Sequence, residues 1–255
     1  MELIILGCHS ATPRENYQTT SQLLKVKKHF FLIDCGEGTQ IQLRKAKINF
    51  SQINHIFISH LHGDHFYGLI GLISSFRLLG RKNSLNIYGP NGIKHLITSL
   101  LKASNSWTNY PLIFNELSSL KSEVLYEDDI VSVKTIPLNH RIYTNGFLFK
   151  CNGKEKTSYA FCSDTIYDEK IIDLIKSSDL LYHDSTFLDI DKNLAKKTKH
   201  STSIEAATIA KKARVKKLIL GHYSSRYKKK TEFLKEAKSV FKNSCLSEDL
   251  KRFLF

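Results

Sequence analysis

The sequence lacks several features that mark secreted or membrane-spanning proteins. It has only five cysteines, an odd number, and they are scattered without CxxC spacing. This argues against a disulfide framework and against a cysteine zinc site, and it favours reduced thiols in a cytoplasmic protein. No apolar run approaches the roughly 18–20 residues needed to cross a bilayer. The N-terminal residues pass straight from an apolar run into Gly7, which indicates a first strand and not a signal peptide.

Acidic residues are also scarce. The chain carries 38 Lys and Arg against 24 Asp and Glu, for a net charge of +14. A basic surface favours a polyanionic partner through counterion release, although lysine-rich solubility is the plain alternative. There are no repeats or Pro- or Ser-rich linkers in the 255 residues, and the 42% hydrophobic content is that of a globular protein. We therefore expect a single domain over residues 1–255.

The order of apolar segments predicts a mixed α/β fold. Strands are expected at residues 2–6, 22–26, 29–34, 55–59, 86–88, 145–150, 157–163, 180–183 and 217–221, with several more between residues 113 and 137. Helices are expected at residues 39–45, 66–79, 92–101, 203–214 and 231–242. Long β runs in each half favour two packed sheets covered by helices over a doubly wound parallel sheet. Polar candidates repeatedly follow the expected strand ends, where functional loops tend to lie.

The run from His60 to His65 carries the strongest chemical signal. His60 and His62 are two residues apart at a strand end, so an extended backbone can point both the same way. Asp64 and His65 follow Gly63, which permits a sharp turn. Four potential ligands in six residues exceed what one tetrahedral ion takes from one loop. The pattern predicts two metal ions, and imidazole and carboxylate ligands without thiolate suit catalytic zinc or manganese.

The sequence from Ser59 to His65 matches the HxHxDH signature of the metallo-β-lactamase superfamily. Within it, the chain resembles the ribonuclease Z family of tRNA 3′-processing endonucleases. The resemblance covers about residues 2–227 and rests on the segments 6–13, 31–40, 137–140, 163–165, 183–187, 200–202 and 221–227. It implies an αββα four-layer sandwich with a two-metal site at one edge.

The resemblance assigns seven metal ligands. It places His60, His62 and His140 on one zinc ion, Asp64, His65 and His222 on the other, and Asp164 between them. Two zinc ions per subunit are expected, with manganese as an alternative. Independently of the family, His140, Asp164 and His222 each follow an apolar strand.

Three residues are expected to act in catalysis. A metal-activated water would attack the scissile phosphate, with Asp64 orienting it or accepting its proton. His200 would protonate the leaving 3′-oxygen, and Asp184 would orient it where the family more often carries Glu. A surface role for His200 is the alternative. Asp34 and His183 are either partners of the ligand histidines or ordinary strand-end polar residues.

Substrate phosphate could be contacted by Ser201, Thr202, Ser224 and Arg226. Arg226 suits bidentate phosphate binding, but it could equally pair with a carboxylate.

The expected function is removal of the 3′ trailer from precursor tRNA, with no membrane partner. The alternatives are a phosphodiesterase acting on small diesters and a non-catalytic RNA-binding relative, which the intact ligand set disfavours. Family members of this size usually carry a long tRNA-gripping arm, but here only residues 151–156 separate two strands. The arm is therefore absent or very short near 150–156. The resemblance also implies a homodimer, an expectation that the missing arm weakens.

Overall fold

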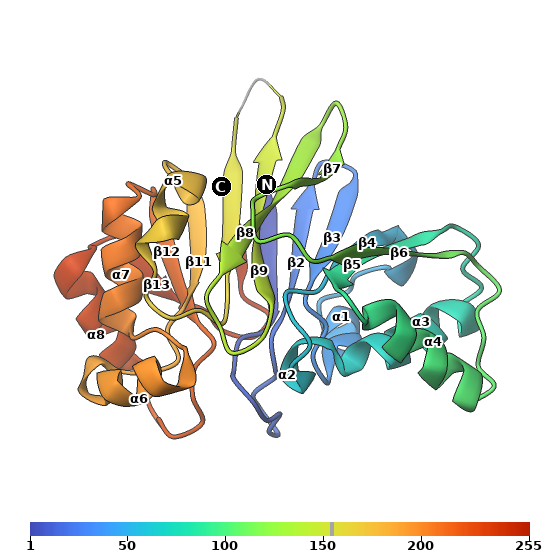
Figure 1. The fold of residues 1–255 in the computed structure, drawn as a ribbon, viewed down its shortest axis with the longest axis horizontal. Coiled ribbons are helices and arrows are strands. Elements are labelled where there is room, and N and C mark those ends of the chain that lie inside the picture. The colour runs from blue at the N-terminus through green and yellow to red at the C-terminus, as the bar shows by residue number, and fades with distance from the viewer. Residues whose placement is uncertain (154–155) are drawn as a thin grey trace. The chain divides into compact units, whose positions relative to one another are not determined.

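The computed structural model of the protein describes residues 1–153 and 156–255. These residues form two compact units. Unit 1 contains residues 1–118 and 248–254, and unit 2 contains residues 119–247 and Phe255. Each unit is built on one seven-stranded sheet (Figure 1). The expectation of a single domain is not decided by this division.

The sheet of unit 1 combines antiparallel and parallel strands. Its strands are β1 (Glu2–Gly7), β2 (Ser21–Val26), β3 (His29–Ile33), β4 (Ile53–Phe57), β5 (Leu85–Pro90), β6 (Leu112–Leu117) and β14 (Arg252–Leu254). They follow the order β14-β1-β2-β3-β4-β5-β6. The strands from β14 to β3 pair antiparallel, and those from β3 to β6 pair parallel. The parallel half therefore brings the carboxyl ends of β3 and β4 to the same sheet edge.

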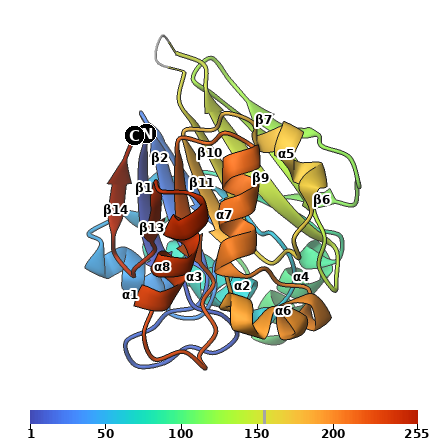
Figure 2. The ribbon, with the colours of Figure 1, turned by 90° about the vertical axis from the view of Figure 1, so that its left-hand side faces the viewer.

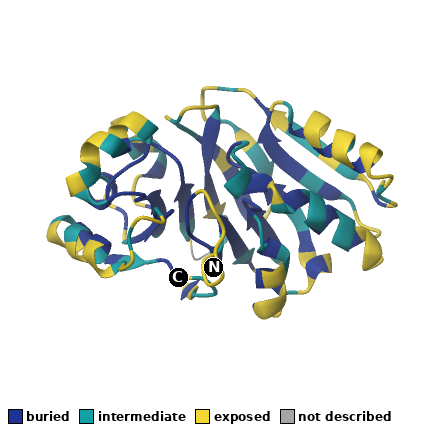
Figure 3. Cartoon of the chain, turned by 90° about the horizontal axis from the view of Figure 1, so that it is seen from below, coloured by how far each residue is buried: buried dark blue, intermediate teal, exposed yellow. Residues whose placement is uncertain are grey.

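Short amphipathic helices connect the strands of unit 1. They are α1 (Thr39–Lys45), the 3-10 turn η1 (Phe50–Gln52), α2 (Gly63–Phe66), α3 (Gly68–Leu78) and α4 (Ile93–Ala103). In α4, Ile93, Ile97 and Leu101 are buried at a spacing of four residues, whereas Leu96 and Leu100 on another face are exposed. This two-sided pattern is visible in Figure 3, where the helices carry buried and exposed faces and the strands are mostly buried.

The sheet of unit 2 has the same size and a similar mixture of pairings. Its strands are β7 (Val124–Glu127), β8 (Val131–Leu138), β9 (Thr144–Cys151), β10 (Ser158–Cys162), β11 (Leu180–Asp184), β12 (Lys217–Gly221) and β13 (Ser244–Leu246). The strands from β7 to β10 pair antiparallel, and those from β10 to β13 pair parallel. The strands expected at residues 145–150 and 157–163 are therefore present as the antiparallel neighbours β9 and β10, and residues 154–155 between them lie outside the described residues.

The helices of unit 2 are concentrated between its parallel strands. They are η2 (Glu169–Ile171), α5 (Ile172–Ile175), η3 (Asp189–Asp191), α6 (Lys192–Thr198), α7 (Ser203–Lys212) and α8 (Thr231–Val240). Figure 2 shows α7 beside α8. The start of α7 is fixed by a capping box, in which Thr202 and Glu205 satisfy each other's backbone N–H groups. None of the helices in the described part of the chain is long and apolar enough to cross a membrane.

Three candidate site residues follow strand ends in the left-handed conformation. Asp34 follows β3 with a φ of 56°, Asp164 comes two residues after β10 with 58°, and His222 follows β12 with 63°. Residues other than glycine rarely adopt such angles, and they do so mainly where the surrounding structure imposes them. At each of these turns, the side chain departs from the pattern in which successive side chains of a strand point to opposite faces of the sheet.

Two expectations differ from the observed elements. The helix expected at residues 66–79 is preceded by α2, so that Asp64 and His65 lie on a helical turn and not in an open loop. The C-terminal strands β13 and β14 were not predicted. Each has only three residues, which is too short for an alternating pattern to be recognised.

Candidate metal centre

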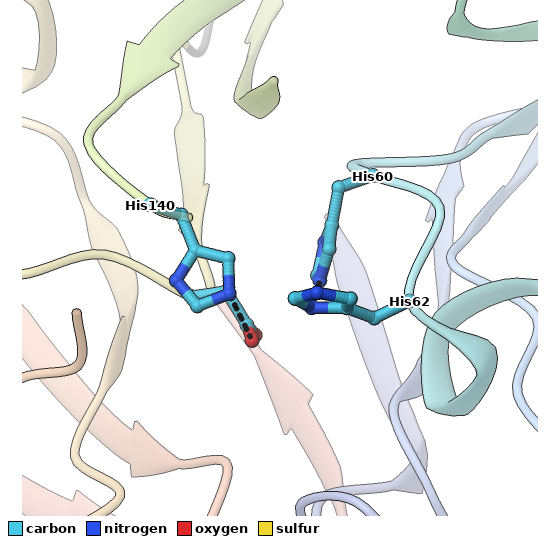
Figure 4. Close-up of side chains that lie close together, drawn as sticks. His60, His62 and His140 are labelled. Atoms are coloured by element: carbon cyan, nitrogen blue, oxygen red, sulfur yellow. Dashed lines mark hydrogen bonds and ion pairs between the residues drawn. The ribbon is translucent and has the colours of Figure 1, made fainter. Parts of the chain in front are cut away.

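In unit 1, the histidine pair that follows β4 is held close together. The Nε2 atom of His60 lies 2.9 Å from the Nδ1 atom of His62, and the two rings meet nearly at right angles (Figure 4). The extended backbone therefore points both imidazoles the same way, as their spacing predicted. His60 is fully buried and His62 is partly exposed.

A buried carboxylate organises this part of unit 1. Asp34 Oδ2 accepts a hydrogen bond from His65 Nδ1 at 2.7 Å and one from the Ser59 hydroxyl at 2.9 Å. Asp34 Oδ1 accepts from the backbone N–H of Ser59 at 2.7 Å. Burial raises the pKa of Asp34, although the attraction and hydrogen bond of His65 oppose that shift. Of the two alternatives for Asp34, the structure therefore shows the first, a contact with a predicted ligand histidine.

Asp64 is held by the loop that follows β1, through the backbone N–H of Ala11. Its Oδ2 atom accepts a hydrogen bond from the backbone N–H of Ala11 at 2.8 Å and lies 3.5 Å from His65 Nε2. One carboxylate oxygen therefore faces both a fixed donor and the neighbouring imidazole. This restrains the carboxylate before any ligand binds.

The backbone around these residues is packed tightly. A Cβ atom on Gly68 would lie 2.1 Å from the carbonyl oxygen of Gly36, which no side chain can tolerate. The close approach is held by two hydrogen bonds, from the N–H of Gly68 to the Cys35 carbonyl and from the N–H of Cys35 to the His65 carbonyl. The segment after β3 is thereby fixed against the segment that carries His65.

In unit 2, Asp164 lies between two predicted ligand histidines. Its Oδ1 atom is 3.2 Å from His222 Nε2, and its Oδ2 atom is 3.6 Å from His140 Nε2. Burial lowers the pKa of His140 to about 4, although Asp164 opposes the shift. His140 is therefore neutral near pH 7, as a metal ligand must be.

The pair formed by Asp184 and His200 is the second buried cluster of unit 2. His200 Nδ1 lies 2.8 Å from Asp184 Oδ2, and Asp184 is fully buried. Burial alone would lower the pKa of His200, but the charge and hydrogen bond of Asp184 outweigh it and raise that pKa. Burial likewise opposes ionisation of Asp184, yet His200 holds the pKa of Asp184 below its usual value. Both shifts favour the charged pair.

The hydrogen bonds fix the tautomers of four predicted ligand histidines. Their Nδ1 atoms lie within 3.0 Å of an acceptor: Ser59 Oγ for His60, Asp34 for His65, the Lys199 carbonyl for His140, and Thr186 Oγ1 for His222. Ser59 and Thr186 give their own hydroxyl protons to carboxylates, so each must accept from its histidine. In each of these histidines Nε2 is therefore the unprotonated nitrogen, which is the form that can bind a metal ion. The donor set fits zinc or manganese.

Other candidate residues have partners within unit 2. His183 Nδ1 bonds the backbone carbonyl of Asp184, and not a ligand histidine. Successive residues of a strand face opposite sides, so His183 turns away from the face that Asp184 occupies. Thr202 caps α7, Ser201 donates to the Thr165 carbonyl, and Arg226 lies 3.8 Å from an Asp191 carboxylate oxygen. Their expected contacts with substrate phosphate stay predictions.

No local pattern indicates Thr186 or the Lys199 carbonyl as a partner of a ligand histidine. A hydroxyl two residues after Asp184 is common in loops, and a backbone carbonyl has no residue signature. Ser59 adjoins His60, so its role could have been considered from position alone. A cavity of about 810 Å³ in unit 2 is lined in part by Asn139, His140 and Asn145. That volume is in the range of small-molecule sites.

Comparison with solved structures defines the class of protein. The metallo-β-lactamase fold protein YhfI from Bacillus subtilis superimposes with a TM-score of 0.84 at 20% identity, covering 99% of this chain and 98% of that one. The short form of human tRNase Z superimposes with a TM-score of 0.86 at 30% identity, covering 100% of this chain and 99% of that one. The chain therefore has the metallo-β-lactamase fold, which confirms the predicted fold class.

Sequence relatives define the family within this class. The ribonuclease Z of Bacteroides fragilis is 40% identical over 97% of each chain. That of Azobacteroides pseudotrichonymphae is 41% identical over 97% of this chain and 96% of its own. Residues 1–244 also match the family model described as Anti-Pycsar protein Apyc1. The chain belongs to the ribonuclease Z family.

Proposed function

We propose that this protein is a metal-dependent endoribonuclease that removes the 3′ trailer from precursor tRNA. The observation that carries the proposal is the buried pair of His200 and Asp184, 2.8 Å apart, in a chain that is 40% identical to a ribonuclease Z over 97% of its length. A hydrolytic metal site alone fits many substrates. An imidazole whose protonated form is favoured by a buried carboxylate adds a proton donor for a poor leaving group such as a 3′-alkoxide.

The metal ligands are proposed from residue type, order and tautomer. We assign His60, His62 and His140 to one zinc ion, Asp64, His65 and His222 to another, and Asp164 to both, with manganese as the alternative metal. When bound, the two ions would activate water and stabilise the charge that develops on the phosphate. The fixed Nε2 lone pairs of His60, His65, His140 and His222 support this assignment.

The remaining chemistry belongs to the side chains. Asp64, restrained by the Ala11 N–H at 2.8 Å, is placed to orient the attacking water and accept its proton. His200 donates a proton from Nε2 to the leaving 3′-oxygen, while its Nδ1 stays on Asp184. Asp184 supports this step in two ways, because it raises the pKa of His200 and fixes the plane of the ring.

The net charge of +14 supports a tRNA partner, since a polyanion releases counterions when it binds a basic protein. We also propose a cytoplasmic location, which suits precursor tRNA and the five cysteines, all of them free thiols. A homodimer is proposed from family membership alone. Equilibrium sedimentation of the purified protein would test the dimer.

The short connection between β9 and β10 bears on tRNA affinity. The alignment with the Bacteroides fragilis relative extends over 294 positions, whereas this chain has 255 residues, so the relative has segments without a counterpart here. We propose that a tRNA-gripping arm is absent or very short near residues 150–156, of which 154–155 lie outside the described part. Chemistry should then persist while KM for precursor tRNA is high. Equally weak turnover of a small phosphodiester would contradict this explanation.

The decisive experiment is incubation of the purified protein and a 3′-extended tRNA with zinc or manganese. Cleavage that releases the trailer supports the proposal. Hydrolysis of small diesters without trailer removal would instead support the alternative of a general phosphodiesterase, for which the cavity beside His140 provides room. Retained metal binding and RNA binding with no hydrolysis of either substrate would indicate a non-catalytic relative.

A further inference from the structure

A second group of metal-binding side chains lies at the start of unit 1. It consists of Cys8, His9 and Asp249, which we call the N-terminal cluster. Cys8 and His9 follow β1, and Asp249 lies just before β14. Because β14 pairs antiparallel with β1, the chain positions before β14 and after β1 meet at the same end of the two strands. Residues 240 positions apart are therefore brought together by the sheet.

The three donor atoms of the N-terminal cluster form a nearly regular triangle. Cys8 Sγ lies 3.8 Å from His9 Nδ1 and 3.4 Å from Asp249 Oδ1, and the latter two atoms are 3.9 Å apart. Tetrahedral zinc with ordinary Zn–S, Zn–N and Zn–O bonds separates its ligand atoms by ~3.3–3.6 Å. The two edges that meet at Cys8 Sγ are within ~0.3 Å of that spacing, and the edge between His9 Nδ1 and Asp249 Oδ1 is longer by ~0.6 Å.

The three donor atoms already interact with one another. The Cys8 thiol donates to Asp249 Oδ1 and also lies within sulfur hydrogen-bond distance of His9 Nδ1. The third edge, of 3.9 Å between His9 Nδ1 and Asp249 Oδ1, is longer than a hydrogen bond. A cation at the centre would bind all three donor atoms at once. Thiolate, imidazole and carboxylate together suit zinc or another borderline-soft divalent ion.

The ligands of the N-terminal cluster are also held in place by their neighbours. Asp249 Oδ2 accepts a hydrogen bond from the Gln18 N–H at 2.9 Å, which leaves Oδ1 directed at the triangle. The His9 ring packs edge-on against the Tyr17 ring, with the ring centres 4.4 Å apart, and the backbone N–H of His9 donates to the Gln18 carbonyl. Cys8 and His9 are buried, and the Asp249 side chain retains 15% exposure. An ion would therefore enter the cluster from solvent on the side of the Asp249 carboxylate.

We propose that Cys8, His9 and Asp249 form a binding site for a zinc-class divalent ion, with a water molecule as fourth ligand. This site shares no residue with the proposed catalytic ligands. An ion at this site would link His9, at the start of the loop of residues 9–18, to Asp249, which bonds Gln18 at the end of that loop. The same loop carries the Ala11 N–H that donates to Asp64. The ion therefore fixes the loop that restrains Asp64, and it does so from outside the catalytic ligand set.

Cobalt(II) is the probe that isolates this site. A thiolate bound to cobalt gives a charge-transfer band in the near ultraviolet, whereas the imidazole and carboxylate ligands of the proposed catalytic centre give none. Burial raises the pKa of the Cys35 thiol to about 12 and also raises that of Cys162, so both are poor sources of the band. The partly exposed thiols of Cys151 and Cys245 are distinguished from Cys8 by substitution. The full-length reduced protein should develop the band on titration with cobalt, and zinc should displace it.

Two variants and a matched control make the test decisive. Cys8→Ser should abolish the band, and Asp249→Asn, which can still accept from Gln18, should weaken cobalt binding by more than about tenfold. Cys245→Ser, at a thiol that contacts the Leu218 carbonyl, should leave it unchanged. Absence of the band in the unaltered protein would overturn the proposal. So would its persistence in Cys8→Ser, or unchanged cobalt affinity in Asp249→Asn. These results do not depend on ribonuclease activity.

Discussion

Replacement of Asp184 by asparagine tests the buried pair most directly. Asp184 Oδ2 accepts from His200 Nδ1 at 2.8 Å and from the Thr165 N–H at 3.1 Å, while Oδ1 accepts from the N–H and hydroxyl of Thr186 at 2.9 and 2.7 Å. An asparagine oxygen can keep the contacts to Thr186. Its amide nitrogen must then face the Thr165 N–H, which it cannot bond, and His200 Nδ1, which it can bond only if the ring gives up its Nδ1 proton.

The expected loss of stability follows from this arrangement. Breaking a buried ion pair by neutralising one partner costs about 3–5 kcal/mol of unfolding free energy. The matched control is Asp179→Asn in the same unit, because Asp179 pairs with Lys216, whose side chain is 74% exposed. That pair lies near the surface, and its loss should cost at most about 1 kcal/mol. Turnover should fall about 10²–10⁴-fold in Asp184→Asn if His200 is the general acid.

The difference in unfolding free energy between the unaltered protein and Asp184→Asn should depend on pH in a definite direction. Folding raises the pKa of His200, so its contribution is complete below the ordinary histidine pKa and is lost as pH rises through the folded value. Folding lowers the pKa of Asp184, so its contribution is lost as pH falls through the folded value. The difference between the unaltered protein and Asp184→Asn should therefore be largest between about pH 4 and 6.5. The alkaline limb of the activity profile should also move to lower pH in the variant.

Urea unfolding of chelator-treated protein at about pH 5.5 and about pH 8.5 measures the stability difference. Single-turnover cleavage across the same range measures the shift of the alkaline limb. The reasoning is refuted if Asp184→Asn costs no more than Asp179→Asn and the difference does not depend on pH. In that case, the pair would not be ionised in the folded protein.

Three further results are expected. Thr202→Ala removes the capping box of α7 and should lower the unfolding free energy by about 1 kcal/mol in urea titrations; no change would show that the cap is replaced by solvent. Gly68→Ala places a Cβ atom 2.1 Å from the Gly36 carbonyl and should lower stability by about 1–3 kcal/mol, whereas Ser74→Ala on the same helix should change it little. Chelation should abolish trailer cleavage until zinc or manganese is restored, and Asp64→Ala should remain inactive with either metal; activity in either case would contradict the assigned role of the metal or of Asp64.

The predictable part of the fold and site had local sequence signals. The pairing of His60 with His62 follows from strand geometry, because residues two apart in an extended chain face the same side. The strands before Asp34, Asp164 and His222 are compact apolar runs, so their ends could be located within a residue or two. Local patterns of this kind are sufficient where a single element determines the geometry.

The unpredicted part depends on contacts between distant segments. Thr186 meets His222 across 36 residues, and the Lys199 carbonyl meets His140 across 59. Neither contact leaves a spacing that can be read along the chain. The N-terminal cluster is similar, because Asp249 joins Cys8 only through the pairing of β14, a three-residue strand without a clear pattern. From the sequence alone, the five scattered cysteines therefore indicate isolated thiols.

The left-handed backbone at Asp34, Asp164 and His222 has a consequence for protein engineering. Each such residue costs on the order of 1 kcal/mol relative to glycine, which adopts this conformation freely. Glycine, however, offers neither a carboxylate nor an imidazole. Selection for heat resistance alone should therefore accumulate glycine or asparagine at these strand ends and yield variants that are more stable and inactive. Selection for activity would keep the less stable residues, so these three positions are where a stabilised enzyme should be left unaltered.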